Sequence, residues 1–191
     1  MKKLLLVAAV AIMGATVSAQ ENSIKANPAA LLGGTDLISY EHKFGDHFSG
    51  VVGAGYGGFK LGGYKYNSIG GGLQGRYYFT EAMTGFYGAV VGDYLNGNVK
   101  IDSNGFGFNF DGMDMGTGTN TEIKFSGFGG GLRAGYQWIF DSGFTLDVNL
   151  GASYRSYTYD WNNQAEESMY EGALKASGVL PTGSVGIGYS F

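Results

Sequence analysis

The strongest constraint in this sequence is an alternation of apolar and polar side chains with a period of two residues. After residue 143, the apolar set Phe144, Leu146, Val148, Leu150, Ala152 and Tyr154 alternates with the polar set Thr145, Asp147, Asn149, Gly151, Ser153 and Arg155. The same spacing recurs from about residue 35 to the end of the chain. A period of two is typical of a strand whose two faces meet different surroundings. The chain is therefore expected to be all-β.

The side chains on each face favour a membrane barrel over a soluble sandwich. The apolar set carries aromatic residues at its ends and small or aliphatic residues in its middle, which is the pattern of a lipid-facing band with aromatic girdles. The polar set mixes glycine with Arg, Asp, Gln and Asn, whereas a solvated face would more often carry Lys and Glu. We predict a closed antiparallel eight-stranded up-and-down transmembrane β-barrel, because closure removes sheet edges that hydrocarbon cannot solvate.

Residues 1–19 have the order of a secretory signal peptide. Two lysines precede the apolar run Leu4–Met13, and the small residues Val17-Ser18-Ala19 follow it. The run is too short to span a bilayer as a helix, although an N-terminal anchor is the alternative. We expect cleavage to leave a barrel domain of residues 20–191. Loss of this leader takes the formal charge from −4 to −6, which does not suit a nucleic-acid binder.

The connections are predicted to alternate between short and long, as in bacterial barrels. Tight turns are expected at Gly45-Asp46, Thr80-Glu81-Ala82 and Asp141-Ser142-Gly143, and longer connections at 60–67, 97–121 and 158–179. The strands between them are expected at about 35–44, 48–59, 68–79, 84–96, 122–140, 144–157 and 180–191. An even count requires an eighth strand within Asn22–Leu32, turning at Gly33-Gly34, although Pro28 gives up one ladder hydrogen bond.

Charged and amide side chains gather on the face that should line the lumen. The predicted polar network comprises Glu41, Lys43, Gln74, Arg76, Asp93, Arg133, Gln137, Asp147, Asn149 and Arg155. A catalytic interpretation would pair Asp93 with Asp147. We favour structural filling, because an eight-stranded barrel is just wide enough for its side chains to fill and buried charges need partners. Arg133→Ala is therefore expected to destabilise the barrel by leaving acids unpaired.

Other motifs have simple structural explanations. The string Gly53-x-Gly55-x-x-Gly58 fits a dinucleotide-binding pattern, but it lies in a strand and no helix follows it. His42 and His47 flank the turn at Gly45-Asp46 and supply no complete metal ligand set. Some outer-membrane enzymes that act on lipid A use a His–Ser pair at the outer side of the barrel, and these histidines are predicted at the opposite end.

The two longest connections give weaker indications. Asp102, Asp111 and Asp114 lack the closer oxygen spacing and the final Glu of a calcium loop. Residues 161–176 fit either a short helix or an ordered lid. With no cysteine in the chain, disulfides and thiol chemistry are also excluded. We predict no catalytic residue, no cofactor and no metal site.

The C-terminal sequence Ser184-Val185-Gly186-Ile187-Gly188-Tyr189-Ser190-Phe191 resembles the terminal signature of bacterial outer-membrane barrels, with matches at Ser184, Gly186, Tyr189 and Phe191. The resemblance implies that the barrel assembly machinery reads this strand. The mature chain resembles small barrels of the OmpA/OmpX type. Its stretches Asn22–Pro28 and Ile38–Glu41 are similar to small uncharacterised barrels of the Bacteroidota. These likenesses imply the outer membrane of a Gram-negative bacterium.

The sequence therefore predicts a non-enzymatic outer-membrane barrel that serves membrane integrity or surface interaction. The extracellular loops 97–121 and 158–179 are the expected contact sites, because binding usually resides in loops on a rigid scaffold. Outer-membrane lipid, lipopolysaccharide and the assembly machinery are the expected partners, together with an unidentified surface ligand. A narrow porin-like channel is the main alternative, and a lipid A-modifying enzyme is the next.

Overall fold

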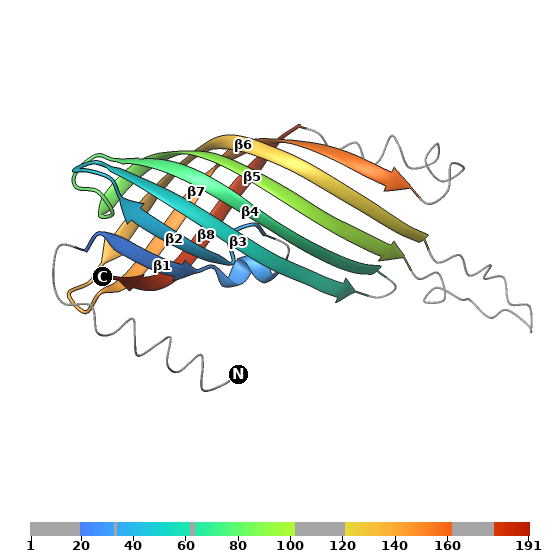
Figure 1. The fold of residues 1–191 in the computed structure, drawn as a ribbon, viewed down its shortest axis with the longest axis horizontal. Helices are drawn as coiled ribbons and strands as arrows, with labels where there is room; N and C mark the ends of the chain where they lie inside the picture. Colours follow the sequence, from blue (N-terminus) through green and yellow to red (C-terminus); the bar gives the residue numbers. More distant parts are fainter. Residues whose placement is uncertain (1–19, 33, 62–63, 102–120, 162–177) are drawn as a thin grey trace, which may run out of the picture.

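A computed structural model describes residues 20–32, 34–61, 64–101, 121–161 and 178–191, and shows one closed ring of eight antiparallel strands (Figure 1). The strands are β1 (Asn22–Ala26), β2 (Ile38–Lys43), β3 (Phe48–Leu61), β4 (Tyr64–Tyr78), β5 (Gly85–Ile101), β6 (Thr121–Ile139), β7 (Phe144–Trp161) and β8 (Gly178–Ser190). Each strand pairs with its neighbours in the chain, and β1 pairs with β8. The predicted all-β, closed antiparallel fold is confirmed.

The two ends of the ring differ in their connections. At one end, the turn end, residues 44–47, 79–84 and 140–143 join consecutive strands, at the three places where tight turns were predicted. The first and last strands also meet there, since Asn22 and Phe191 exchange main-chain hydrogen bonds of 3.0 and 2.8 Å. The opposite end, the loop end, carries the β3–β4, β5–β6 and β7–β8 connections. No helix in the described part of the chain has the length and hydropathy needed to cross a membrane.

The strands reach further toward the loop end than the sequence suggested. The predicted connection at 60–67 was wrong in length, because β3 and β4 remain paired as far as Leu61 and Tyr64. The β5–β6 ladder likewise extends into the predicted loop 97–121, and the β6–β7 ladder extends as far as Trp161 in the predicted loop 158–179. What is left of those loops, residues 102–120 and 162–177, lies outside the described residues, as do residues 1–19. Asp102, Asp111 and Asp114 belong to this undescribed part.

The first strand also differs from its prediction. The eighth strand lies within Asn22–Leu32 as predicted, but β1 covers only Asn22–Ala26, and the 3-10 helix η1 (Pro28–Leu32) follows it. Proline suits the first helical position because its φ is fixed and its missing N–H is not needed there. The next strand begins only at Ile38, so Gly33-Gly34 is not the hairpin turn that was predicted.

The connection between β1 and β2 packs inside the ring. A Cβ atom added at Gly55 would overlap the carbonyl oxygen of Gly34, and one at Gly53 would lie 3.4 Å from the Cβ atom of Asp36. One at Gly70 would lie 2.9 Å from Cγ2 of Thr35. Glycines on the inner face of β3 and β4 therefore leave room for main chain in the lumen.

This short first hairpin leaves the wall of the ring uneven. β1 pairs with β8 only over Ser23–Ala26, whereas β5 pairs with β6 over the whole of Gly85–Ile101. Beyond Ala26 and Ile38, no described strand lies between β3 and β8, and η1 packs against both of them. The seam at β8–β1–β2 is thus the part of the ring with the fewest ladder hydrogen bonds.

Toward the turn end, the outward faces form an apolar belt of exposed side chains. It includes Ile38, Tyr40, Phe44, Phe48, Val52, Tyr56, Ile69, Leu73, Tyr77, Phe86, Val90, Tyr94, Phe128, Leu132, Trp138, Phe144, Val148, Leu150, Tyr154, Val179, Val185 and Ile187. On β7 the belt runs from Phe144 to Tyr154. Ten residues span about 33 Å along a strand, and a tilt of about 40° leaves about 25 Å across a membrane, the height of a lipid-facing band.

Toward the loop end, the inward face of the strands becomes apolar and the outward face becomes polar. On β6 the inward residues Ile123 and Phe125 are buried and apolar, while Glu122 and Lys124 face outward. On β5 the outward face changes from Tyr94 to Asn96, Asn98 and Lys100 while the inward Leu95 is buried. Aromatic rings fill the interior at this level, where Phe59, Tyr66 and Phe125 stack in sequence at 5.4 and 5.9 Å. The loop end therefore has the apolar interior and polar exterior of a soluble barrel, whereas the rest of the ring has a polar interior and an apolar exterior.

Candidate functional site

The lumen near the turn end is crossed by a charged layer of Lys25, Glu41, Arg76, Gln137 and Asp147. The Lys25 ammonium group donates to Glu41 Oε2, to Gln137 Oε1 at 2.6 Å and to Asp147 Oδ2 at 2.9 Å. A lysine has three N–H donors, so all of them are used. Arg76 Nη1 reaches the same three acceptor groups, at 3.3 Å from Glu41, 3.2 Å from Gln137 and 2.7 Å from Asp147.

Two tyrosines and an amide complete this layer. Tyr78 donates its hydroxyl proton to Glu41 at 2.8 Å, and Tyr87 donates to Asp147 at 2.7 Å. The Arg76 guanidinium lies 4.3 Å from the centre of the Tyr87 ring, and its remaining nitrogens donate to Gln74 Oε1 at 3.0 and 3.2 Å. Both tyrosines are at most 1% exposed.

The charged layer spans the lumen. Its members come from β1, β2, β4, β5, β6 and β7, so side chains meet across the full width of the ring. Lys25, Arg76, Glu41 and Asp147 are each 3% exposed or less. Two cations face two carboxylates, so the layer has no net charge and every carboxylate has a cationic partner. This balance is what buried charges require.

Two further ion pairs occupy the lumen. Arg155 Nη2 lies 3.1 Å from Asp93 Oδ2, and Arg133 Nη1 lies 3.8 Å from Asp36 Oδ2 in the β1–β2 connection. The Nε and Nη1 atoms of Arg133 have no hydrogen-bond partner among the described residues. That Arg133→Ala destabilises the barrel stays a prediction. Asp93 and Asp147 bind different cations and do not form a carboxylate pair.

The ten predicted network residues all belong to the inward set of their strands, but they occupy separate groups. Five of them, Glu41, Gln74, Arg76, Gln137 and Asp147, meet in or beside the charged layer. Lys43 lies at the rim instead, 3.4 Å from the exposed Glu81, and Asn149 donates to Ser184 Oγ at 2.7 Å.

Sequence reasoning missed Lys25 and Asp36. Lys25 lies in a five-residue strand that is too short to show its alternation, although Ser23 and Lys25 do form its polar set. Asp36 lies in the connection, where no period indicates which way a side chain points.

Glycine opposite large side chains explains much of the composition. Tyr87 and Gly135 are cross-strand partners, and a Cβ atom at Gly135 would lie 2.5 Å from the Tyr87 ring. One at Gly129 would lie 2.5 Å from Asp93 Oδ1. The narrow lumen thus accepts its tyrosines and ion pairs because the facing positions carry no side chain.

The four C-terminal signature residues lie on β8 and at the end of the chain. Ser184 and Gly186 face the lumen, where a Cβ atom at Gly186 would lie 3.6 Å from Lys25 Cβ. The rings of Tyr189 and Phe191 stack at 6.5 Å at the turn end. Their part in assembly stays a prediction.

The histidines have structural partners at the turn end. His42 Nδ1 lies 2.8 Å from Asn22 Oδ1, and His47 Nδ1 lies 3.0 Å from the carbonyl oxygen of Tyr78. Across the described ranges, no three His, Asp or Glu side chains are grouped as ligands for a metal ion.

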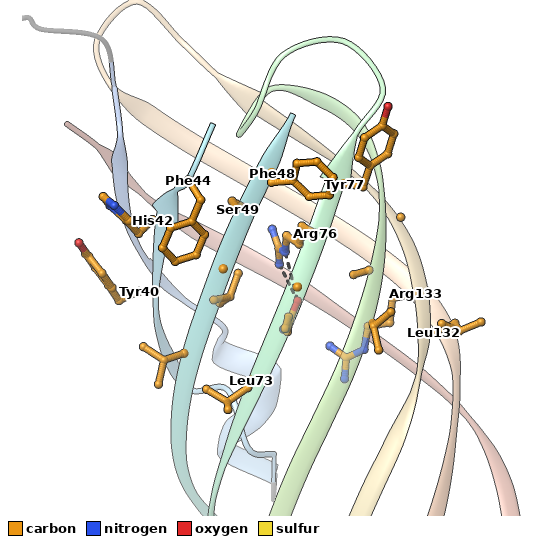
Figure 2. Close-up of a pocket in the computed structure, with 18 residues that line it drawn as sticks. Tyr40, His42, Phe44, Phe48, Ser49, Leu73, Arg76, Tyr77, Leu132 and Arg133 are labelled. Atoms are coloured by element: carbon orange, nitrogen blue, oxygen red, sulfur yellow. Dashed lines mark hydrogen bonds between the residues drawn. The ribbon is translucent and has the colours of Figure 1, made fainter. Parts of the chain in front are cut away.

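A hollow of about 1020 Å³ lies on the outer wall over β2 to β6 (Figure 2). Figure 2 shows the rings of Phe44, Phe48 and Tyr77 toward one end of it, with Leu73 and Leu132 further along the strands. Its floor includes Gly75 and Gly88, where an added Cβ atom would meet nothing within 4 Å. The hollow is largely part of the apolar belt and is not a lumen site.

Comparisons with known proteins place the chain in a family but give no activity. The family described as "Protein of unknown function (DUF3575)" matches residues 4–190. The search of curated proteins found no match. Crystal structures of CarO2 and CarO from Acinetobacter baumannii are each 14% identical to this chain, with TM-scores of 0.48 and 0.46. The alignments cover 90% of this chain and 97% of each of those chains. At such scores the likeness carries no functional argument.

Proposed function

Since the chain belongs to the family described as "Protein of unknown function (DUF3575)", we propose a function from the barrel itself. We propose an outer-membrane barrel of a Gram-negative bacterium that is non-enzymatic and non-conducting. It serves membrane integrity, or contact at the cell surface, as a rigid scaffold. Export by the signal peptide and insertion by the barrel assembly machinery, guided by the C-terminal strand, belong to the same proposal. We also propose that the protein is related to small barrels of the OmpA/OmpX type and of the Bacteroidota.

The observation that carries this proposal is the exchange of faces along the strands. A soluble barrel would keep its apolar side chains inward over its full length, because exposed apolar surface is costly in water. Here Leu132 and Leu150 are 66% and 73% exposed, while inward positions nearby hold buried charges. The pattern reverts to that of a soluble protein only beyond Tyr56, Tyr94 and Tyr154. Such a switch fits strands that leave a lipid layer and continue into water.

The charged layer supports a closed lumen. Ions would have to pass Lys25, Arg76, Glu41 and Asp147, which are bonded to one another across the ring. The β1–β2 connection adds a second obstruction, because its main chain lies against the inner face of β3. This favours a scaffold over a porin-like channel.

A non-enzymatic role is supported by the partners of the histidines. His42 and His47 are bound to an amide oxygen and a main-chain carbonyl oxygen, and neither forms a hydrogen bond with a serine hydroxyl among the described residues. We assign any surface ligand to the β5–β6 and β7–β8 connections, the predicted loops 97–121 and 158–179, because loops on a rigid scaffold usually carry binding.

Three experiments on the mature protein test this proposal. The first is partition: we expect the chain to require detergent or lipid to stay monomeric and folded. A monomer that is soluble without any amphiphile would contradict the membrane location. The second is planar-bilayer recording, where we expect no steady single-channel conductance. Reproducible unitary currents would establish the channel instead. Deletion of residues 102–120 and 162–177 should preserve β-rich circular dichroism and abolish surface binding.

A further inference from the structure

Lysines form a row on the outer face just beyond the apolar belt at the loop end. Lys60 of β3 lies directly opposite Lys65 of β4, and Lys65 lies directly opposite Lys100 of β5. All three side chains are exposed, and Lys124 of β6 lies close by, opposite Asn98. Like charges on directly opposed strand positions repel and destabilise a sheet. The row therefore lowers the stability of the sheet locally unless an anionic group binds there.

The described residues neutralise only part of this charge. Lys100 forms an ion pair with Glu122 at 3.0 Å, and Asp160 lies opposite Lys124 in the β6–β7 ladder. For Lys60, Lys65 and Lys124, no carboxylate oxygen of the described residues lies within 4 Å. Among the described residues of this face, four lysines against two acids leave an excess of two positive charges.

The height of the row places it where lipid headgroups would lie. Lys60 is four residues beyond the belt residue Tyr56, and Lys65 and Lys124 are each four residues from Ile69 and Phe128. Four residues span about 13 Å along a strand and about 10 Å along the membrane normal at a tilt of about 40°. The lysine stem lets its ammonium group reach back toward the membrane interface.

A small pocket lies between the row and the belt. It has a volume of about 270 Å³ and is lined by Tyr56, Asn67, Ile69, Asn96, Asn98 and Lys124. Its lining is apolar on the belt side and amide-bearing on the lysine side. The amides are already aligned, since Asn67 donates to Asn98 at 3.4 Å and Asn98 donates to Glu122 at 3.0 Å. Such a surface suits an amphiphile with a polar head that forms hydrogen bonds.

We propose that this face binds the phosphorylated headgroup of a glycolipid in the outer leaflet. The phosphates would meet Lys60 and Lys65, the sugar hydroxyls would meet the asparagine amides, and the acyl chains would lie along the belt. Lysine binds phosphate as a point charge, and clusters of basic residues beside a membrane attract anionic lipids. This inference rests on the proposed membrane location and names the lipid partner of the barrel.

The test uses the full mature chain in nanodiscs and its binding of bis-phosphorylated lipid A, measured by native mass spectrometry. The variant K60Q/K65Q removes the two lysines that have no carboxylate partner among the described residues. The control is K43Q, because Lys43 lies at the turn end beside Glu81. A basic residue near a membrane surface contributes about fivefold in affinity, so we expect K60Q/K65Q to bind roughly 25-fold more weakly. K43Q should bind like the parent chain, and the urea midpoints of all three should agree closely.

The following binding results would each overturn the inference and leave the proposed function untouched. Equal affinity for phosphatidylglycerol, or for lipid A without its phosphates, would mean that no phosphorylated glycolipid is recognised. Equal affinity for inorganic pyrophosphate would identify a free-anion site instead of a lipid site. Unchanged lipid A binding by K60Q/K65Q would also refute it. Failure of the parent chain to enter nanodiscs would instead refute the membrane location, and with it the proposed function.

Discussion

Replacement of Lys25 by methionine should destabilise the barrel more than any other single lysine substitution. Methionine keeps most of the length of the side chain and removes the ammonium group. The only cationic group left to Glu41, Gln137 and Asp147 would then be Arg76, whose Nη1 carries two protons for three acceptors. The hydroxyl groups of Tyr78 and Tyr87 would still donate to the two carboxylates. The charged layer would change from neutral to one net negative charge in a buried site.

The size of the effect follows from these contacts. Three charge-assisted hydrogen bonds at about 1.5 kcal/mol each give about 4.5 kcal/mol, and partial rearrangement of Arg76 lowers this figure. Breaking a buried ion pair by removal of one partner costs about 3–5 kcal/mol, which agrees. For a loss of about 4 kcal/mol and a urea slope of about 2 kcal/mol/M, the unfolding midpoint falls by about 2 M.

The assay is urea unfolding in detergent micelles, followed by tryptophan fluorescence, with K43M as the control. Lys43 pairs with an exposed carboxylate at 3.4 Å, so K43M should change the free energy of unfolding by less than about 1 kcal/mol. The double variant K25M/E41Q restores charge balance in the layer and should recover part of the lost stability. If K25M and K43M unfold at the same midpoint, the charged layer does not hold the barrel together as we infer.

Three other predictions address packing, seam stability and the exchange of faces. G135V should lower the free energy of unfolding by about 1–3 kcal/mol, because the valine side chain would overlap Tyr87. G75V should change this free energy little, because its side chain would meet open space. Equal effects of the two substitutions would contradict the packing of Tyr87 against Gly135. Amide hydrogens of β1 and β2 should exchange faster than those of β5 and β6 in hydrogen-exchange mass spectrometry, and uniform protection would argue against a weak seam. In a lipid bilayer, V90R should lower the free energy of unfolding by about 2–4 kcal/mol, whereas N98R should leave it almost unchanged. Similar losses at both sites would mean that the apolar belt does not end between these two residues.

The alternation allowed the fold and the inward set to be predicted, because in a strand each residue faces the side opposite to its neighbour. The strand ends at the loop end could not be placed, and the reason is physical. Beyond Tyr94 the outward face turns polar at Asn96 and Asn98 while Leu95 and Val99 stay inward, so the strand continues with its phase reversed. Because the strands were predicted from their outward apolar residues, the sequence beyond this reversal was interpreted as a loop.

The partners within the lumen were also beyond prediction. Which inward residues meet depends on the stagger of strands around the ring, and no local pattern encodes it. Lys25 and Glu41 are adjacent across one ladder, but Lys25 and Asp147 come together only because β1 closes on β8. Asp36 reaches Arg133 only because the connection between β1 and β2 folds inward.

That inward fold has a consequence for the order of events during folding. The main chain around Gly34 lies inside a ring formed by all eight strands, so it cannot be inserted sideways once every ladder has formed. The segment must already occupy its place when the first and last strands meet. We therefore expect the zipping of β1 onto β8 to come last, with the route to the native state passing through an open, curled sheet that has captured its own N-terminal chain.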